Sequence, residues 1–388
     1  MSLFSGIVKK IESFLFSIKR LVEPRQFIYI SSVLVGISAA LAVIVLKSFA
    51  HWVFKSSQYF DSLVHLPFSN STLPIIGILL TVLVIKKVLK GKIDKGTSQI
   101  MYAVAKTRSV MPPKQMYAQI ITSSLTVGMG GSAGLESPIT ITGAAFGSNY
   151  ALNYRLSYKD RTLLLACGVA AGVAAAFNAP IAGVLFAIEV VLAEISLAAF
   201  TPLIISAATG AIISTIVLKE DILFSFKHLY SFNYHNIPYY ILLGILAGFV
   251  SIHYARSFRK VEHFFSKRKT NSFRRALFGS VFLGLLIFVF PTLFGEGYES
   301  IKILADNHPE HLVENSIFER FSEQKWVLLV FISATMLIKV FATGITLGAG
   351  GNGGNFAPSL FVGSYLGFSV AYLCNIIGIA KLPIGNFT

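Results

Sequence analysis

The sequence predicts an all-α protein that crosses a membrane many times, and three observations lead to this. The 388 residues are 54% hydrophobic and only 13% charged, whereas ordinary soluble domains are roughly 25% charged. Long apolar segments recur along the whole chain, and several are interrupted by Gly or Pro. Two of the interruptions share one pattern of glycines and a proline. Because a bilayer leaves no water for backbone groups, such a chain must fold as bundled helices with internal hydrogen bonds.

The net charge is strongly positive, with 33 Lys plus Arg against 18 Asp plus Glu. The basic residues gather in short stretches between apolar runs, which is typical of cytoplasmic loops and not of a nucleic-acid surface. We therefore expect the lipid bilayer as a partner and no nucleic acid. Residues 86–95 and 256–275 are predicted inside, and residues 51–72 and the acidic 296–323 outside. The expected location is a bacterial inner membrane.

The chain begins with a segment, 1–25, that predicts a cytoplasmic amphipathic helix. Apolar residues between positions 4 and 22 fall on one helical face, and lysines and Arg20 lie elsewhere, as in helices that rest on a membrane surface. Cys167 and Cys374 form no CxxC, and the histidines form no HExxH or HxH. No metal and no cofactor are therefore expected. The chain shows no nucleophile–base pair either, so an enzyme is not expected.

The apolar segments are the predicted helices of the bundle. Several are shorter than the roughly 20 residues that a spanning helix needs. Short, interrupted membrane helices that recur in two halves of a chain indicate a binding site near the midplane. The predicted segments are 27–50, 73–89, 116–129, 160–176, 179–199, 201–217, 238–255, 276–294, 326–347 and 359–380.

An internal repeat relates the two interruptions. Residues 130–147 (GGSAGLESPITITGAAFG) and 350–367 (GGNGGNFAPSLFVGSYLG) align without a gap at an offset of 220, with six identities that are all Gly or Pro. The alternative is compositional chance. The first copy follows a basic loop and the second an acidic one, so the repeat is expected to be inverted. We predict a first membrane repeat over 26–217 and a second over 218–388.

The second repeat is expected to be truncated. The first copy is followed by the apolar stretch 167–192, and the counterpart of that stretch should begin near position 387. The sequence ends at Thr388. One repeat element is therefore predicted to lie beyond it.

Each glycine-rich turn predicts an anion site built from backbone. Pro138 and Pro358 fit the first turn of a helix, and the glycines before them permit unusual backbone and close approach. The resulting helix start presents unpaired N–H donors and a partial positive charge to an anion. The alternative is tight packing of helices through small residues. The candidate anion-binding residues are Gly134, Leu135, Ser137, Gly354, Asn355, Phe356 and Ala357.

Glu136 is the strongest single candidate, since it stands at a predicted helix start in an apolar region. Buried carboxylates are costly in a membrane and suggest function. When ionised, Glu136 can itself occupy the N–H site, and when protonated it leaves that site to a dissolved anion. It would then be both a gate and a proton carrier. The alternative is a carboxylate that only caps the helix.

Two further residues have open interpretations. Glu189, within the segment 179–199, is a structural hydrogen-bonding group or a proton relay. Lys95 ends a basic loop, where it is a solvated lysine or a fixed positive charge at the inner mouth of an anion path.

These motifs resemble the CLC family of chloride channels and anion–proton exchangers, over residues 27–380. Residues 134–138 (GLESP) resemble the GxEGP signature of that family, with Ser137 where glycine is usual, and residues 354–358 (GNFAP) resemble its GxFxP signature. Residues 177–183 (FNAPIAG) resemble a third conserved stretch. The resemblance implies that Glu136 is the gating glutamate, that the amides of Asn355 and Phe356 line the central anion site, and that the protein is a homodimer.

The chain departs from the family pattern in three places. The GSGIP motif of the family contains a serine that coordinates the central anion. The equivalent position, 41 residues before Glu136, is Lys95 in this chain, and Ser98 or Thr97 would have to take the place of that serine. The inner proton glutamate of the exchangers falls on Val190, which resembles the channels, although some exchangers also lack that acid. The last helices and the pore tyrosine of the family are absent from the sequence.

The predicted function is passage of chloride or a similar small anion through a midplane site gated by Glu136, either channel-like or weakly coupled to protons. Chloride is the only expected ligand. One alternative is a chloride/proton exchanger with a different inner proton route around Glu189 and Val190. A more remote alternative is a secondary transporter for another substrate.

Overall fold

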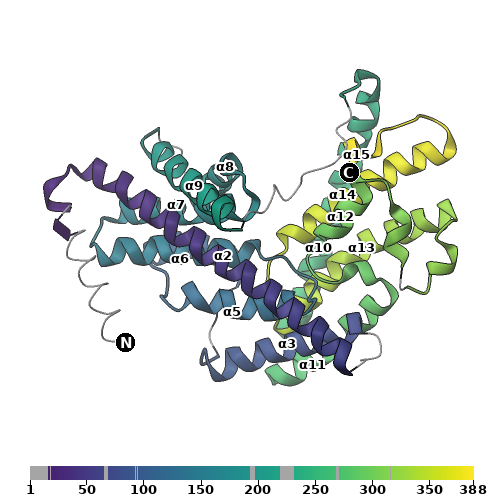
Figure 1. The fold of residues 1–388 in the computed structure, drawn as a ribbon, viewed down its shortest axis with the longest axis horizontal. Coiled ribbons are helices and arrows are strands. Elements are labelled where there is room, and N and C mark those ends of the chain that lie inside the picture. The colour runs from purple at the N-terminus through teal and green to yellow at the C-terminus, as the bar shows by residue number, and fades with distance from the viewer. Residues whose placement is uncertain are drawn as a thin grey trace. The chain divides into compact units, whose positions relative to one another are not determined.

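The computed structural model describes residues 16–17, 19–64, 69–91, 93, 95–192, 197–218, 231–267, 271–314 and 316–388. The predicted amphipathic helix of segment 1–25 lies mostly outside the described residues. In the described part of the chain the elements are α-helices and short 3₁₀ turns, with one isolated β-bridge. The chain divides into two compact units, each assembled from three stretches of sequence (Figure 1).

The first unit comprises residues 1–47, 94–120 and 139–223, with α7 at its centre. Every residue of α7 from Leu164 to Ala176 is buried, and most are Ala, Gly or Val. These small residues let backbones touch, since an added Cβ on Gly168 would overlap the carbonyl of Gly143 in α6. Small-residue contacts of this kind hold helices together in lipid. Its helices are α4 (Ser98–Lys106), α7 (Tyr158–Phe177), α8 (Pro180–Val191) and α9 (Leu197–Leu218), with the beginning of α2 (Pro24–Val64) and of α5 (Gln115–Gly128) and most of α6 (Glu136–Asn153).

The second unit comprises residues 48–93, 121–138 and 224–388. Two apolar cores hold it together, one between α12, α13 and α14 and another between α3, α10, α11 and α13. Helices α11 and α3 approach closely at Gly284, where an added Cβ would lie 2.7 Å from the carbonyl oxygen of Ser71. Its helices are α3 (Ser69–Lys87), α10 (Ile237–Lys267), α11 (Ser272–Val289), α12 (Tyr298–Ala305), α13 (Lys325–Ala349), α14 (Phe356–Ile377) and α15 (Ile384–Phe387), with the 3₁₀ turns η1 (Tyr234–Asn236), η2 (Pro291–Leu293), η3 (Pro309–Val313) and η4 (Glu319–Phe321).

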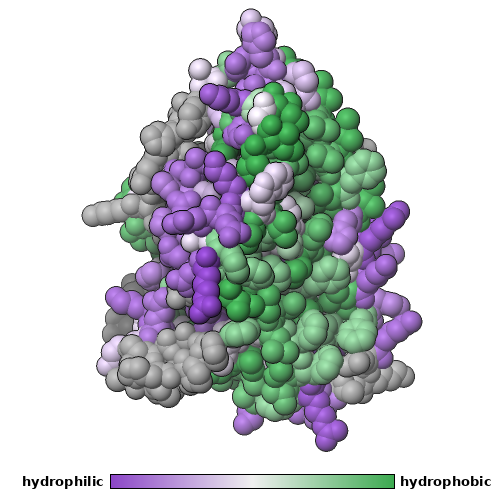
Figure 2. Space-filling model, turned by 90° about the vertical axis from the view of Figure 1, so that its right-hand side faces the viewer, coloured by the Kyte–Doolittle hydropathy of each residue, from purple (hydrophilic) through white to green (hydrophobic). Residues whose placement is uncertain are grey.

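Eight helices of the described residues are long and apolar enough to cross a membrane. They are Pro24–Tyr59, Asn70–Lys87, Tyr158–Phe177, Ala198–Leu218, Tyr234–Lys267, Ser272–Val289, Lys325–Ala349 and Phe356–Ile377. Figure 2 shows a broad apolar area on one face, with hydrophilic residues gathered along its margins. An exposed apolar surface of that extent suits contact with lipid. The prediction of an all-α, multi-pass membrane protein is confirmed.

Three predicted boundaries were wrong. Helix α2 continues to Val64, beyond the expected end at residue 50, and α10 continues to Lys267 through the basic stretch that was expected to be a loop. Neither extension contains Gly or Pro, so nothing in the backbone stops the helix. The single segment 179–199 is instead divided, with α8 ending at Val191 and α9 beginning at Leu197. The predicted repeat boundaries at 26, 217 and 218 stay a prediction.

Candidate functional site

The two glycine-rich turns pair with each other inside the second unit. The N–H of Gly134 donates to the carbonyl oxygen of Gly354 at 2.9 Å, and the N–H of Gly354 donates to that of Gly134 at 2.8 Å. This antiparallel bridge joins the two copies of the repeat at equivalent positions, 220 residues apart. It is the contact that two copies entering from opposite sides would make.

The same equivalence extends to the helix ends that precede the turns, which the sequence alignment did not include. Gly131 donates to the carbonyl of Thr126 at 2.8 Å, and Gly351 donates to that of Thr346 at 3.0 Å. Gly130 and Gly350 both have positive φ, 87° and 124°, a conformation that glycine adopts without strain. The two copies therefore end one helix, turn and begin the next in the same way.

Buried polar side chains form a hydrogen-bond network beside the two turns. The N–H of Asn352 donates to Oγ1 of Thr126 at 2.9 Å, and its side-chain amide donates to Oγ1 of Thr122 at 2.7 Å. Oγ1 of Thr81 lies 2.9 Å from Oγ1 of Thr126. Buried polar groups of this kind stay buried only when they are hydrogen-bonded, so the network holds the turns in one conformation.

Two helices begin beside the glycine bridge. Helix α6 starts at Glu136 and α14 starts at Phe356, which are equivalent positions of the repeat. The first N–H groups of each helix have no partner within their own helix and carry its partial positive charge. The predicted donors near residues 134–137 and 354–357 therefore lie at two helix starts that the bridge holds together.

The carboxyl group of Glu136 lies at these helix starts and is nearly buried, with 6% of the residue exposed. Its Oε1 accepts a hydrogen bond from the hydroxyl of Tyr298 at 2.5 Å. Its Oε2 lies over Gly134, because an added Cβ there would overlap that oxygen and would approach the Cβ of Ala357 to 2.8 Å. The carboxyl group therefore folds back over the bridge, against the first turn of α14.

A second carboxylate approaches the same helix start. The N–H of Leu135 donates to Oε1 of Glu296 at 2.9 Å. Lys339 of α13 is fully buried, and its ammonium donates to the carbonyl oxygens of Leu293 and Gly295 at 3.3 and 3.1 Å. Its charge also interacts with that of Glu296.

Sequence reasoning missed the contacts that Glu296, Tyr298 and Lys339 make around this site. Glu296 was grouped with the acidic residues of a loop, and neither of the others was singled out. Lys339 carried a signal, since a lysine in the middle of a long apolar segment is rare and usually functional. The sequence held no comparable signal for Tyr298, because its partner Glu136 is 162 positions away.

The start of α14 is less enclosed than the start of α6. Ala357 is buried, whereas Asn355 and Phe356 are exposed, Phe356 to 39%. The hydroxyl of Tyr254 donates to the carbonyl oxygen of Asn355 at 3.3 Å. Ser137 and Gly354 are both buried and in contact, since an added Cβ on Gly354 would lie 2.7 Å from that of Ser137.

The remaining predicted residues lie in the first unit. Lys95 is half-buried, and Ser98 is exposed at the first residue of α4, where the preceding Thr97 makes no side-chain cap. Glu189 is exposed on α8, and Val190 packs against the core of that unit. Their roles in anion or proton movement stay predictions.

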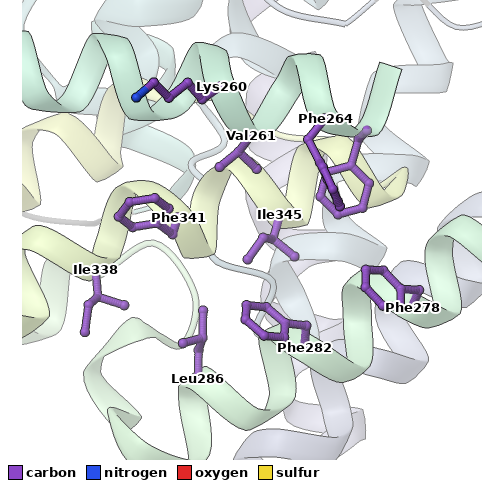
Figure 3. A pocket seen from close by; sticks show the side chains of 10 residues that line it. Lys260, Val261, Phe264, Phe278, Phe282, Leu286, Ile338, Phe341 and Ile345 are labelled. Carbon is purple, nitrogen blue, oxygen red and sulfur yellow. The ribbon is translucent and has the colours of Figure 1, made fainter. Parts of the chain in front are cut away.

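Two other features of the second unit are separate from the helix starts. A cavity of about 550 Å³ between α10, α11 and α13 is lined by nine apolar side chains and Lys260 (Figure 3). Its apolar lining does not suit a small anion.

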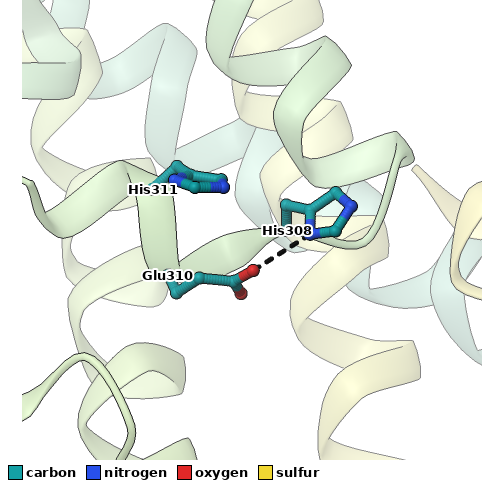
Figure 4. A group of neighbouring side chains, drawn as sticks. All are labelled: His308, Glu310 and His311. Carbon is teal, nitrogen blue, oxygen red and sulfur yellow. Dashed lines mark hydrogen bonds and ion pairs between the residues drawn. The ribbon is translucent and has the colours of Figure 1, made fainter.

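The second feature is a group of neighbouring side chains in the segment after α12. His308, Glu310 and His311 lie close together, with a hydrogen bond of 3.0 Å between His308 and Glu310 (Figure 4). Their ligand atoms lie within 4.8 Å of one another, a spacing that the search for HExxH and HxH did not cover. His311 also hydrogen-bonds Glu314 at 2.5 Å, and this bond raises the pKa of His311.

Comparison with known proteins identifies the family. Residues 76–388 match the family described as voltage gated chloride channel. The chain belongs to this family. Its members are channels or transporters of anions. The resemblance to CLC proteins is confirmed.

Curated relatives carry names of the same kind. The chain is 28% identical to a putative chloride channel protein ClcB-like of Ralstonia nicotianae, over 90% of this chain and 80% of that protein. It is 29% identical to the voltage-gated ClC-type chloride channel ClcB of Escherichia coli, over 64% of this chain and 55% of that protein. It is 26% identical to the chloride channel protein CLC-e of Arabidopsis thaliana, over 94% of this chain and 52% of that protein. The chain thus spans about half the length of two of these relatives.

Solved structures show the same fold. A CLC-type fluoride/proton antiporter matches with a TM-score of 0.72 and 24% identity, over 93% of this chain and 84% of that one. A slow cyanobacterial Cl⁻/H⁺ antiporter matches with a TM-score of 0.72 and 20% identity, over 93% of this chain and 82% of that one. The CLC-like fold is confirmed.

Proposed function

We propose that this protein moves chloride or a similar small anion across a membrane through the paired starts of α6 and α14, with Glu136 as the gate. The position of the Glu136 carboxyl group, over Gly134 and against Ala357, is the observation that supports this best. A carboxylate at the N-terminal end of a helix occupies the place that a dissolved anion would take.

The proposed gating step exchanges one anion for another. Ionised, the Glu136 carboxylate is stabilised by the partial positive charge of the two helix starts. Protonated, it loses that stabilisation and leaves the amides of Asn355 and Phe356 to chloride. Flux should therefore rise as the pH falls, because protonation removes the tethered competitor.

The degree of proton coupling separates two versions of this function. Val190, where the exchangers' usual inner acid would stand, supports the channel-like or weakly coupled version. The alternative is a chloride/proton exchanger, which is favoured by the two solved structures of this fold named as proton antiporters. In that version protons leave Glu136 by a route past Glu189.

Four further expectations belong to the proposal. Lys95 and Ser98 take the place of the family's anion-coordinating serine segment, chloride is the ligand, and the protein works as a homodimer. It lies in a bacterial inner membrane, as the Escherichia coli relative suggests.

The test measures chloride and proton movement together in liposomes loaded with chloride. Glu136→Gln, which imitates the protonated side chain, should conduct at every pH and lose the pH dependence of flux. Glu299→Gln is the matched control, because Glu299 is an exposed acid one residue from Tyr298. Persisting pH dependence in Glu136→Gln would contradict the proposed gate. Uphill proton movement in the unaltered protein would establish the exchanger, and absence of chloride flux would point to another substrate.

A further inference from the structure

The segment from η2 to the first residue of α12 runs along the glycine turn and the start of α6, and it makes three hydrogen bonds there. The N–H of Gly295 donates to the carbonyl oxygen of Gly130 at 3.0 Å. Glu296 accepts the hydrogen bond of the Leu135 amide at 2.9 Å. The hydroxyl of Tyr298, at the first residue of α12, donates to Glu136. We call residues 295–298 the strap.

The strap is fixed from its other side as well. The ammonium of Lys339 donates to the carbonyl oxygen of Gly295 at 3.1 Å and lies 4.7 Å from the centre of the Phe361 ring. Gly297 has a φ of 94°, and an added Cβ there would overlap Phe361. A side chain is therefore excluded at Gly297, and the strap lies directly on α14.

We propose that the strap is a latch on the gate, in which Tyr298 positions the Glu136 carboxyl group and Glu296 is a second tethered carboxylate that competes with the anion for the Leu135 amide. This inference rests on the proposed role of Glu136 as the gate. An entering anion would have to displace both carboxylates. Glu136 would leave when it is protonated, and Glu296 would be displaced from the N–H of Leu135.

Tyr298 acts through the ionised form of Glu136. Hydrogen bonds to a carboxylate are stronger than hydrogen bonds to a neutral acid and favour the charged form. Burial, and then the nearby carboxylates of Glu136 and Glu296, raise the pKa of Tyr298, so its hydroxyl remains a donor at any physiological pH. Losing such a bond changes the ratio of ionised to protonated gate about tenfold.

Glu296 acts in the opposite direction on the gate. Among the described residues, Tyr298 and Glu296 are titratable neighbours of the Glu136 carboxyl group, with Lys339 facing Glu296, while the α14 start presents the apolar Ala357. A like charge disfavours ionisation of its neighbour. Replacing Glu296 by alanine should therefore make Glu136 harder to protonate, and it should also leave the Leu135 amide to chloride.

The first test compares pH profiles of chloride flux in liposomes. Tyr298→Phe should move the half-maximal flux about one pH unit higher, because a tenfold change in the protonation ratio equals one unit. Tyr372→Phe is the control, since it removes a tyrosine hydroxyl from α14 of the same unit, away from the gate. In the Glu136→Gln background Tyr298→Phe should change nothing further.

Two outcomes separate the latch from the gate. A flat profile in Glu136→Gln together with an unmoved midpoint in Tyr298→Phe would overturn the latch and leave the proposed function standing. A profile in Glu136→Gln that keeps its pH dependence would overturn the gate itself.

The second test concerns the competing carboxylate. Glu296→Ala removes both the charge and the oxygen that accepts the Leu135 N–H, so it should lower the chloride concentration for half-maximal flux severalfold and move the pH midpoint downward. Glu296→Asp keeps the charge but withdraws the oxygen from the Leu135 amide. It should also lower the chloride concentration for half-maximal flux, and it provides the test if the alanine variant fails to fold. An unchanged or higher chloride requirement in a folded variant would overturn the role of Glu296.

Discussion

A series of glycine-to-alanine substitutions separates the gate from the bridge that supports it. An added Cβ on Gly134 would overlap Oε2 of Glu136, whereas one on Gly354 would meet Ser137, with 2.7 Å between the two Cβ atoms. Both glycines take part in the same two backbone hydrogen bonds. The two substitutions therefore strain the bridge alike, but only Gly134→Ala forces the carboxyl group to move.

The expected magnitudes follow from these contacts. Overpacking a close contact costs about 1–3 kcal/mol, and each bridge bond contributes about 1 kcal/mol, so both variants should lose about 1–4 kcal/mol of stability. Gly363→Ala is the control, because nothing lies within 4 Å of its added Cβ in α14. A glycine inside a helix is less favourable than alanine by roughly 0.5–1 kcal/mol, so this variant should gain stability.

The assay is chloride flux against pH, with thermal unfolding in detergent measured alongside. Gly134→Ala should flatten the pH profile as Glu136→Gln does, since the carboxyl group can no longer lie against the start of α14. Gly354→Ala should lower stability but keep the pH dependence. The reasoning would be refuted if the two variants had the same pH profile.

Two further predictions concern charged groups of the second unit. Lys339→Met should lower the free energy of unfolding by about 1–3 kcal/mol, because it leaves the buried carbonyl oxygens of Leu293 and Gly295 without the donor that Lys339 supplies; Lys325→Met, at the first residue of α13, is the control, and equal losses in the two variants would contradict this role of Lys339. His311 should titrate above its ordinary value of 6.5, because the bond to Glu314 raises its pKa. The pair therefore contributes to stability below that ordinary value, and the contribution is lost as the pH rises through the raised value. Histidine NMR signals should show the midpoint returning toward the ordinary value in Glu314→Gln, and an unchanged midpoint would refute the assignment.

The sequence predicted the two glycine-rich turns and their repetition, because the backbone conformation of such a turn restricts which residue types can form it. Gly130, Gly134 and Pro138 recur in the second copy since only certain residues fit such turns. The partners of the gate could not be found that way. Tyr298 and Glu296 meet α6 through the tertiary fold, and nothing near them in sequence distinguishes them from other residues of an acidic loop.

Helix lengths show a different limit. The basic residues after position 255 predicted a loop. Arg and Lys are good helix formers, however, and α10 carries them on exposed positions up to Lys267. The end of α8 at Val191 could not be predicted from the sequence, because no Gly or Pro stands between Val191 and Leu197.

The reciprocal bonds between Gly134 and Gly354 restrict how the pathway can open. Many transporters expose a central site to each side in turn by rocking one repeat against the other. Here the two glycine turns are hydrogen-bonded to each other at the proposed site itself, so a movement that separates them would have to break both bonds and bury unpaired backbone groups, at a cost of about 1–3 kcal/mol each. We therefore expect the pathway to open by a local movement of the Glu136 side chain, while the two turns stay paired.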